Sequence, residues 1–409
     1  MSKLPDTALP PAFIRIGWSN LFAQLSEQMA LAAAPLAAVL LLAAGPAETG
    51  WLQMAQTLPF LLLSIPAGLA ADRASRRNLM VSSEMLRAVS LVATLLLMVS
   101  GLLTLPLLGL MGFIGAIGTV CYNVAAPALV PAIVPRARLA DANRWLELAR
   151  SFAYSGGPAI GGAIVAWSGA SLAYVAATAL SLLSVSLLAG LGDHHPPAMP
   201  KRNPLQDLAE GARFLAGHPL LRPILVTAIV FNTAWFVLQA VYVAYAVQTL
   251  GLTATGVGIT LGIYGAGMMI GALAAPAIGR RVPFGVMITL GPLGGLMAAA
   301  AMLATIWVPS GALAGLSFFL FGSGPVLWSI ATLTLRQAVT PNAMLGRVSA
   351  FIATATFGAR PIGAALGAMV ATRFGVEACL AVAASGFLMQ FLVIIASRVP
   401  QLRALPEAA

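Results

Sequence analysis

The sequence is poor in charge. Only 8% of its 409 residues are charged and 60% are hydrophobic, and the mean hydropathy is +0.93. Soluble domains carry about 25% charged residues, so this composition excludes an ordinary soluble fold. The sequence predicts an integral membrane protein.

Residues that bind metals or perform catalysis are also scarce. There are 12 Asp and Glu, three His and two Cys. Cys121 and Cys379 lie in apolar runs and fit neither a metal motif nor a disulfide framework. The histidines fall in the segment 194–218 with no acidic or cysteine cluster, so we expect no metal site and no cofactor. The G-x-x-x-x-G-K-[ST] and H-E-x-x-H motifs do not occur, which argues against an ATP-driven pump and against a membrane enzyme.

The positive net charge of +10 reflects membrane topology and not nucleic-acid binding, because the 22 Lys and Arg residues punctuate apolar runs. Four charge-free intervals hold 48, 42, 57 and 54 residues, and each can supply two spans of about 20 residues. With four single spans, an all-α protein of twelve transmembrane helices is predicted. Breaks within the long intervals are expected near 105–106, 168–171, 251–256 and 307–311.

The basic residues also predict the orientation. If both termini are cytoplasmic, 18 of the 22 fall in cytoplasmic loops, tails or inner helix ends. Arg87, Arg150 and Arg360 then lie within spans, and only Arg373 faces outward. This is a strong positive-inside bias. Short loops and an Ala/Leu/Gly-rich composition suit a bacterial inner membrane.

A polar, Pro-rich segment divides six predicted spans from six. After it, apolar residues recur at helical spacing from Leu205 to Leu215, which predicts a short amphipathic helix on the membrane surface. The expected organisation is a six-helix half at 1–192, a linker at 193–218 and a second half at 219–409. Similar stretches recur at offsets of 203 to 208 residues, as in secondary transporters built from repeats.

One hydrophilic stretch, Gly68-Leu-Ala-Ala-Asp-Arg-Ala-Ser-Arg-Arg77, joins the second and third predicted spans. It resembles the loop at this place in the major facilitator superfamily. The resemblance implies that Asp72 interacts with the start of span eleven near Gly346 and holds one state of an alternating-access cycle. A plain cytoplasmic retention turn is the alternative. The residues concerned are Gly68, Asp72, Arg73, Arg76 and Arg77.

Further stretches narrow the resemblance. The segment 210–222 reads E-G-A-R-F-L-A-G-H-P-L-L-R. It is similar to the E-G-x-R-F-L-x-x-H-P-x-L-R segment of the branch that contains the enterobactin exporter and bacterial macrolide-efflux proteins. The resemblance implies a monomeric transporter of a small molecule.

Span five carries Gly157-Pro158-Ala-Ile-Gly161-Gly162, which is similar to the antiporter motif G-P-x-x-G-G of this family. The glycine that the family has four residues earlier is Ala153 here, so the motif is incomplete. Close helix packing by small residues, with a bend at the proline, is the alternative.

Charged residues at membrane depth are costly and usually functional. Glu27 lies twelve residues past Arg15, about 18 Å along a helix, and Arg360 lies thirteen past Arg347, roughly 20 Å. Both therefore fall near the middle of a core about 30 Å thick. We expect Glu27 to be the main proton or cation site, and Arg360 an anion contact or a gating partner of Glu27. Structural pairing is the alternative for each.

Two i,i+3 pairs lie nearer the inner face. For Glu84 and Arg87 mutual neutralisation is favoured, whereas Glu147 and Arg150 are balanced between structure and transport. Polar and aromatic residues on single helical faces are expected to line a cavity, with membrane-interface aromatics as the alternative. They are Gln24, Tyr122, Asn123, Asn232, Trp235, Gln239, Trp328 and Thr332.

The leading hypothesis is therefore a secondary active exporter of a drug-like amphiphile or a siderophore-like metabolite, driven by proton antiport. An uptake symporter or facilitator of the same fold is the alternative, and a membrane enzyme is a weaker one.

Overall fold

The protein is helical throughout the part of the chain that the structure describes. This computed structural model describes residues 10–73, 75–135, 138–192 and 204–406. It describes the backbone alone at 68–73, 127–128, 131–132, 139–141, 143–144, 147, 204–205 and 342–343. No strand occurs within these ranges.

The described elements are long α-helices with one short 3-10 helix at the end. The first five are α1 (Pro11–Leu42), α2 (Pro46–Arg73), α3 (Arg76–Val99), α4 (Leu105–Ile133) and α5 (Leu139–Ala189). The others are α6 (Pro204–Gly217), α7 (Leu221–Gln248), α8 (Ala254–Gly279), α9 (Phe284–Ala304), α10 (Gly311–Val339), α11 (Asn342–Ile395) and the 3-10 helix Val399–Gln401.

Two of these helices are interrupted by a single glycine. Gly169 in α5 has φ 81° and Gly375 in α11 has φ 80°. Glycine adopts this left-handed region without the steric cost that a side chain adds, so the chain turns sharply and each element consists of two helical segments. The break expected at 168–171 is confirmed. The breaks expected near 251–256 and 307–311 overlap the connections 249–253 and 305–310 between described helices.

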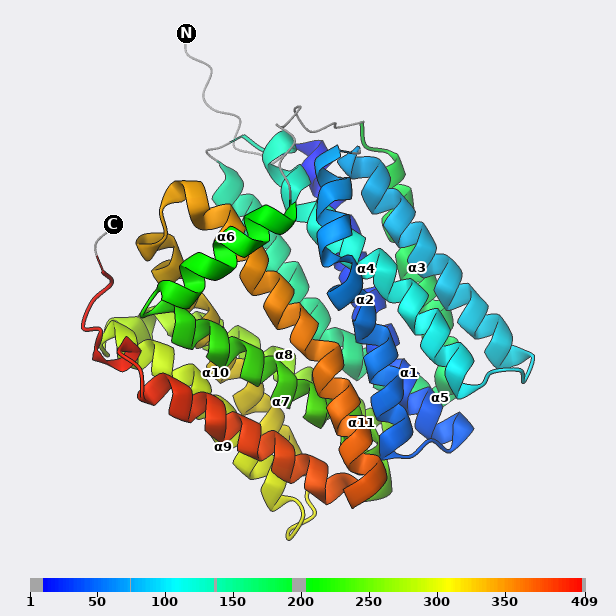
Figure 1. The fold of residues 1–409 in the computed structure, drawn as a ribbon. Helices are drawn as coiled ribbons and strands as arrows, with labels where there is room; N and C mark the ends of the chain where they lie inside the picture. Colours follow the sequence, from blue (N-terminus) through cyan, green and yellow to red (C-terminus); the bar gives the residue numbers. More distant parts are fainter. Residues whose placement is uncertain (1–9, 74, 136–137, 193–203, 407–409) are drawn as a thin grey trace.

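The helices pack as two groups, α1–α5 and α7–α11 (Figure 1). The groups meet where α2 packs against α11 and α7, and where α5 packs against α8. We call the end of the bundle that carries α6 the α6 end, and the opposite end the far end. At the far end, Thr49 Oγ1 donates to the Ala240 carbonyl at 2.8 Å and Gln248 Nε2 donates to the Ala44 carbonyl at 3.1 Å. These bonds tie one group to the other.

The short helix α6 lies where an amphipathic helix is predicted, and it crosses the start of α11 (Figure 1). Arg347 of α11 forms ion pairs with Asp207, at 2.8 Å, and with Glu210. Gly211 permits the close approach, because a Cβ at this position would lie 2.5 Å from the Arg347 carbonyl oxygen. The helix α6 is thereby fixed to the second helix group.

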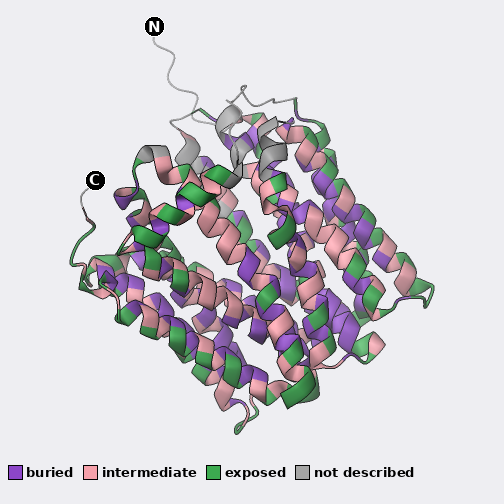
Figure 2. Ribbon diagram, viewed as in Figure 1, coloured by how far each residue is buried: buried purple, intermediate pink, exposed green. Residues whose placement is uncertain are grey.

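Buried residues line the contacts between helices, and apolar side chains also cover much of the outside (Figure 2). Trp167 is 86% exposed and Leu273 76% exposed. A soluble protein rarely leaves so much apolar surface open to water, whereas lipid covers it at no cost. Nine of the described helices are long and apolar enough to cross a membrane.

The first helix is unusual because several of its buried residues between 19 and 28 are polar. Ser19 and Ser26 of α1 are fully buried against α5. The Ser19 hydroxyl lies 2.7 Å from that of Ser184, and Ser26 donates to the Ala177 carbonyl at 2.7 Å. Such hydrogen bonds join transmembrane helices that no hydrophobic effect drives together. They hold α1 in one rotation, which directs Glu27 towards α3.

Candidate functional site

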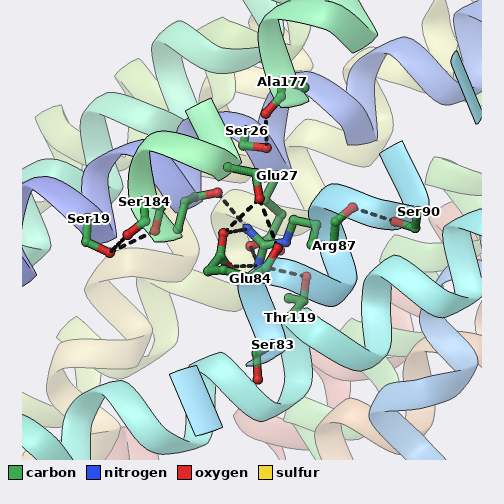
Figure 3. A network of polar contacts seen from close by, with 12 residues as sticks. Ser19, Ser26, Glu27, Ser83, Glu84, Arg87, Ser90, Thr119, Ala177 and Ser184 are labelled. Atoms are coloured by element: carbon green, nitrogen blue, oxygen red, sulfur yellow. Dashed lines mark hydrogen bonds and ion pairs between the residues drawn. The ribbon is translucent and has the colours of Figure 1, made fainter. Parts of the chain in front are cut away.

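Three charged side chains meet inside the first helix group (Figure 3). Nη2 of Arg87 on α3 lies 3.1 Å from Oε1 of Glu84, which is one turn earlier, and 3.8 Å from Oε2 of Glu27 on α1. The predicted i,i+3 pair is therefore present, and Glu27 joins it. The sequence marked Glu27 as a proton site but did not identify Arg87 as its partner.

Neighbouring helices fix this acidic cluster of Glu27, Glu84 and Arg87. Arg87 donates to the Ala23 carbonyl of α1 at 2.8 Å and to the Thr119 hydroxyl of α4 at 3.1 Å. Ser181 of α5 donates to Oε2 of Glu84 at 3.2 Å. Because four helices contribute, the guanidinium and the Glu84 carboxylate have little freedom to move.

The charges of the acidic cluster do not balance. Two carboxylates share one guanidinium, which leaves one negative charge when every group is ionised. An uncompensated charge is expensive in a low-dielectric interior. Binding one proton makes the cluster neutral, so the arrangement can take up and release a proton as its surroundings change.

Glu27 is the carboxylate better placed to exchange that proton. Glu84 is held by Arg87 and Ser181 and its side chain is 0% exposed, whereas the Glu27 side chain is 13% exposed. The contact from Glu27 to Arg87 is also the longer one, at 3.8 Å. Glu84 and Arg87 thus form the fixed pair, and Glu27 is the looser, more accessible member.

Arg360 lies in α11, among aromatic rings. The guanidinium carbon is 4.4 Å from the ring centroid of Phe357, 5.4 Å from that of Phe60 and 5.6 Å from that of Phe236. Phe60 comes from α2, so rings from both helix groups surround the cation. No ion pair joins Arg360 to Glu27, the partner that the sequence suggested.

A cavity of about 370 Å³ lies in the second helix group beside Arg360. Its walls come from α7, α9, α10 and both segments of α11. Three of the residues predicted to line a cavity contribute, namely Asn232, Trp328 and Thr332. Arg336, which the sequence placed only as a topological charge at an inner helix end, lines the same cavity. The volume is at the small end of the range for ligand pockets, about 300–1,000 Å³.

The other predicted lining residues lie outside this cavity. Trp235 belongs to an aromatic cluster, with ring centroids 4.8 Å from Phe321 and 5.3 Å from Tyr264. Tyr122 is 1% exposed in the core of the first group. Gln24 is buried on α1, Gln239 is half-buried on α7, and Asn123 is exposed on α4.

The predicted switch loop is only partly described. Gly68, Asp72, Arg73 and Glu147 are described by their backbone alone. Arg76 is half-buried at the start of α3, and Arg77 donates to the carbonyls of Leu188 and Ala189, which ties α3 to the end of α5. Arg150 is exposed on α5. The proposed contact between Asp72 and α11 therefore stays a prediction.

The antiporter-like glycines lie at two close helix contacts. A Cβ on Gly157 would lie 2.5 Å from the Gln28 Cβ, and one on Gly161 would lie 3.3 Å from the Met29 Cα, so these two pack against α1. A Cβ on Gly162 would lie 2.6 Å from the Ala254 carbonyl oxygen and 2.8 Å from the Gly258 Cα of α8. Pro158 also contributes, because its carbonyl oxygen would be 2.6 Å from a Cβ on Gly258. The motif thus brings the backbones of the two helix groups together.

We expect Gly162→Val to force α5 and α8 apart, because the new side chain would overlap the backbone of α8. Overpacking of this kind costs about 1–3 kcal/mol. The purified variant should unfold at a lower temperature in detergent. Gly156→Val is the matched control, since a Cβ there meets only side-chain atoms at 3.8 Å or more. Equal melting temperatures for the two variants would contradict a tight contact at Gly162.

Comparisons with known proteins agree with this architecture. The family model described as "Transmembrane secretion effector" matches residues 11–409. The chain is 29% identical over 304 residues to the enterobactin exporter EntS of Escherichia coli O1:K1 / APEC, over 73% of this chain and 71% of that protein. The same figures hold for the enterobactin exporter EntS of Shigella boydii serotype 18.

Solved structures share the fold. A bacterial homologue of the iron transporter ferroportin in an inward-facing state superposes with a TM-score of 0.73 at 17% identity, covering 94% of this chain and 98% of that one. A POT family transporter in complex with 5-aminolevulinic acid gives 0.75 at 12% identity, covering 95% and 96%. At such identities these likenesses show the fold alone.

The relatives and the family are transporters, and the spans are those of a multi-pass protein of the bacterial inner membrane. The resemblance to this family that short motifs indicated is confirmed by the family model, which matches nearly the whole chain. The chain belongs to the transmembrane secretion effector family of the major facilitator superfamily.

Proposed function

We propose that this transporter is a secondary active exporter in which proton uptake drives release of a small molecule outside the cell. The observation that carries the proposal is the acidic cluster, where the buried Glu84 and the partly exposed Glu27 share one guanidinium. A site inside the membrane that is neutral with one proton bound, and whose looser carboxylate is not fully buried, has the chemistry that proton coupling needs. The same imbalance would serve no purpose in a purely structural ion pair.

The proposed topology has twelve spans and both termini in the cytoplasm. Counting α5 and α11 as two segments each, and leaving out α6, supports this number. The strong bias of Lys and Arg supports the orientation. We place the halves at 1–192 and 219–409, joined by the linker 193–218, and we propose that the transporter acts as a monomer.

Rocking of the two helix groups would expose the site to each side of the membrane in turn. The bonds at the far end, from Thr49 and Gln248, would break in that movement. The close α5–α8 contact at Gly162 is suited to act as a pivot, since few side chains interlock there. The substrate would be a siderophore-like metabolite or a drug-like amphiphile, by analogy with the relatives that export enterobactin.

An uptake symporter or a facilitator of the same fold is the second candidate, because the fold alone does not determine direction. A symporter would also use the acidic cluster as its proton site. A facilitator would leave that cluster without a role.

The sign of proton movement distinguishes these candidates. Proteoliposomes loaded with a pH-sensitive dye are given an outward substrate gradient, using a panel of siderophores, macrolides and cationic dyes. For antiport we expect the lumen to become more acidic as substrate leaves, because protons enter in exchange. A more alkaline lumen would indicate symport, and substrate efflux with unchanged lumen pH would indicate a facilitator. Either result would refute proton antiport.

A further inference from the structure

The cavity in the second helix group contains two cations and no described acidic lining residue. Arg336 and Arg360 both line it. The Nε atom of each is buried and has no hydrogen-bond partner. The same is true of Nε of Arg87, but that guanidinium is held in an ion pair, whereas no ion pair joins Arg336 or Arg360 to a described residue. Buried polar groups nearly always have partners, so these two cations are available to an anion from outside the protein.

The contacts of Arg360 with the protein are aromatic. Three rings lie within 5.6 Å of its guanidinium carbon, and that of Phe357 is nearest at 4.4 Å. Cation–π contacts stabilise the charge, but they do not supply the oxygen acceptors with which guanidinium N–H groups form their strong hydrogen bonds. The planar fork of donors matches a carboxylate or a similar anion. The aromatic rings therefore hold the cation in place for an anion to bind.

The remaining walls are uncharged. Apolar residues form the larger part of them, and the polar residues are Thr227, Asn232, Ser329, Thr332, Thr356 and Gln390. Leu221, Ile224 and Phe231 contribute from α7, and Trp328 from α10. Trp328 is held close to α9, because a Cβ on Gly291 would lie only 2.4 Å from the Trp328 Cβ. An inorganic anion would gain nothing from such walls, whereas an organic anion buries its apolar body against them.

The two arginines lie at different depths. Arg336 is in the last turn of α10, towards the α6 end. Arg360 lies eighteen positions after the first residue of α11, about 27 Å along the helix axis. An anion arriving from the α6 end would meet Arg336 first and Arg360 deeper in the bundle.

We propose that this cavity binds the anionic group of the transported molecule, and that the substrate is an organic anion with a compact apolar body. This substrate class rests on the proposed transport function, but the site itself can be tested without transport. Arg336 acts at the entrance and Arg360 holds the bound anion.

The test is equilibrium dialysis of the full-length, detergent-purified protein with radiolabelled 1-naphthoate, and with uncharged 1-naphthamide as the matched probe. Micelles without protein give the background. We expect saturable binding of the anion that exceeds binding of the amide. Arg360→Gln and Arg336→Gln should each weaken naphthoate binding by roughly ten- to a hundredfold, the effect of losing a hydrogen bond to a charged group. Arg373→Gln, which removes an exposed cation away from the cavity, should leave it unchanged.

Several outcomes would overturn the proposal. One is equal binding of naphthoate and naphthamide, and another is full naphthoate binding in both cavity variants. Displacement of naphthoate by phosphatidylglycerol, but not by an uncharged lipid, would assign the site to a lipid headgroup and refute a soluble substrate. Arg336 is only half-buried, so its variant provides the test if Arg360→Gln does not fold. The dialysis experiment imposes no gradient, so it tests the anion site separately from transport. The anion site can be refuted while proton-coupled transport is confirmed, and proton-coupled transport can be refuted while the anion site is confirmed.

Discussion

We expect Glu27→Gln to abolish substrate-driven proton movement and to leave the protein folded. The amide keeps the shape of the carboxyl group but cannot take up and release a proton. It also removes the surplus negative charge of the acidic cluster, so Glu84 and Arg87 remain as a neutral pair at 3.1 Å. In dye-loaded proteoliposomes, the pH change should fall to the leak of protein-free liposomes. Exchange of labelled for unlabelled substrate at equal concentrations, which needs no net proton transfer, should persist.

The matched control is Glu377→Gln, which removes an exposed carboxylate just after the turn at Gly375. It should transport like the unmodified protein. Glu27→Asp retains a titratable group on a shorter side chain and should keep a reduced proton response. Undiminished proton movement in the Gln variant would remove Glu27 from the coupling mechanism and leave it a structural role.

The second large effect concerns stability. We expect Arg87→Met to destabilise the protein severely, because two carboxylates would then be buried without a counter-charge. Breaking a buried ion pair by removing one partner typically costs about 3–5 kcal/mol. The Ala23 carbonyl and the Thr119 hydroxyl would also lose their donor. The measurement is the unfolding temperature of the purified protein in detergent.

Arg347→Met provides a matched control, because Arg347 also contacts two carboxylates, Asp207 and Glu210. Those partners are 31% and 46% exposed, so water can replace the arginine. Exposed pairs contribute about 0–1 kcal/mol, and we expect a correspondingly small change. The double variant Arg87→Met with Glu84→Gln should recover part of the stability lost at Arg87. An equal fall in unfolding temperature for Arg87→Met and Arg347→Met would show that the burial of the ion pair does not determine how much each arginine contributes to stability.

The sequence predicted the helices better than their contacts. Charge-free runs and turn residues located the breaks near Gly169, Gly251 and Ser310. A glycine in the left-handed region interrupts or ends a helix, and the Ser310 hydroxyl caps the start of α10, in each case through local interactions. Membrane length then limits how many spans a run can hold. These are properties of short segments, and a single sequence contains them.

The acidic cluster could be predicted only in part. Composition and depth indicated Glu27, and spacing indicated the pair of Glu84 and Arg87. Their meeting depends on how α1 and α3 are rotated about their axes. Hydrogen bonds to α5 fix α1 through Ser19 and Ser26, and α3 through Glu84. Arg336 was counted as a topological charge, since its position near a helix end fits that role equally well. Trp235 shares a helical face with Asn232, but periodicity does not reveal that other aromatic rings cover it.

The acidic cluster and the cavity occupy different helix groups. Glu27, Glu84 and Arg87 belong to α1 and α3, whereas the cavity is lined by α7, α9, α10 and α11. Under the proposed function, the proton and the transported molecule would therefore be recognised by different helix groups. A substitution in the cavity wall would then alter which molecule is bound without changing a residue of the acidic cluster. Such a division would let one scaffold carry different molecules with the same source of energy.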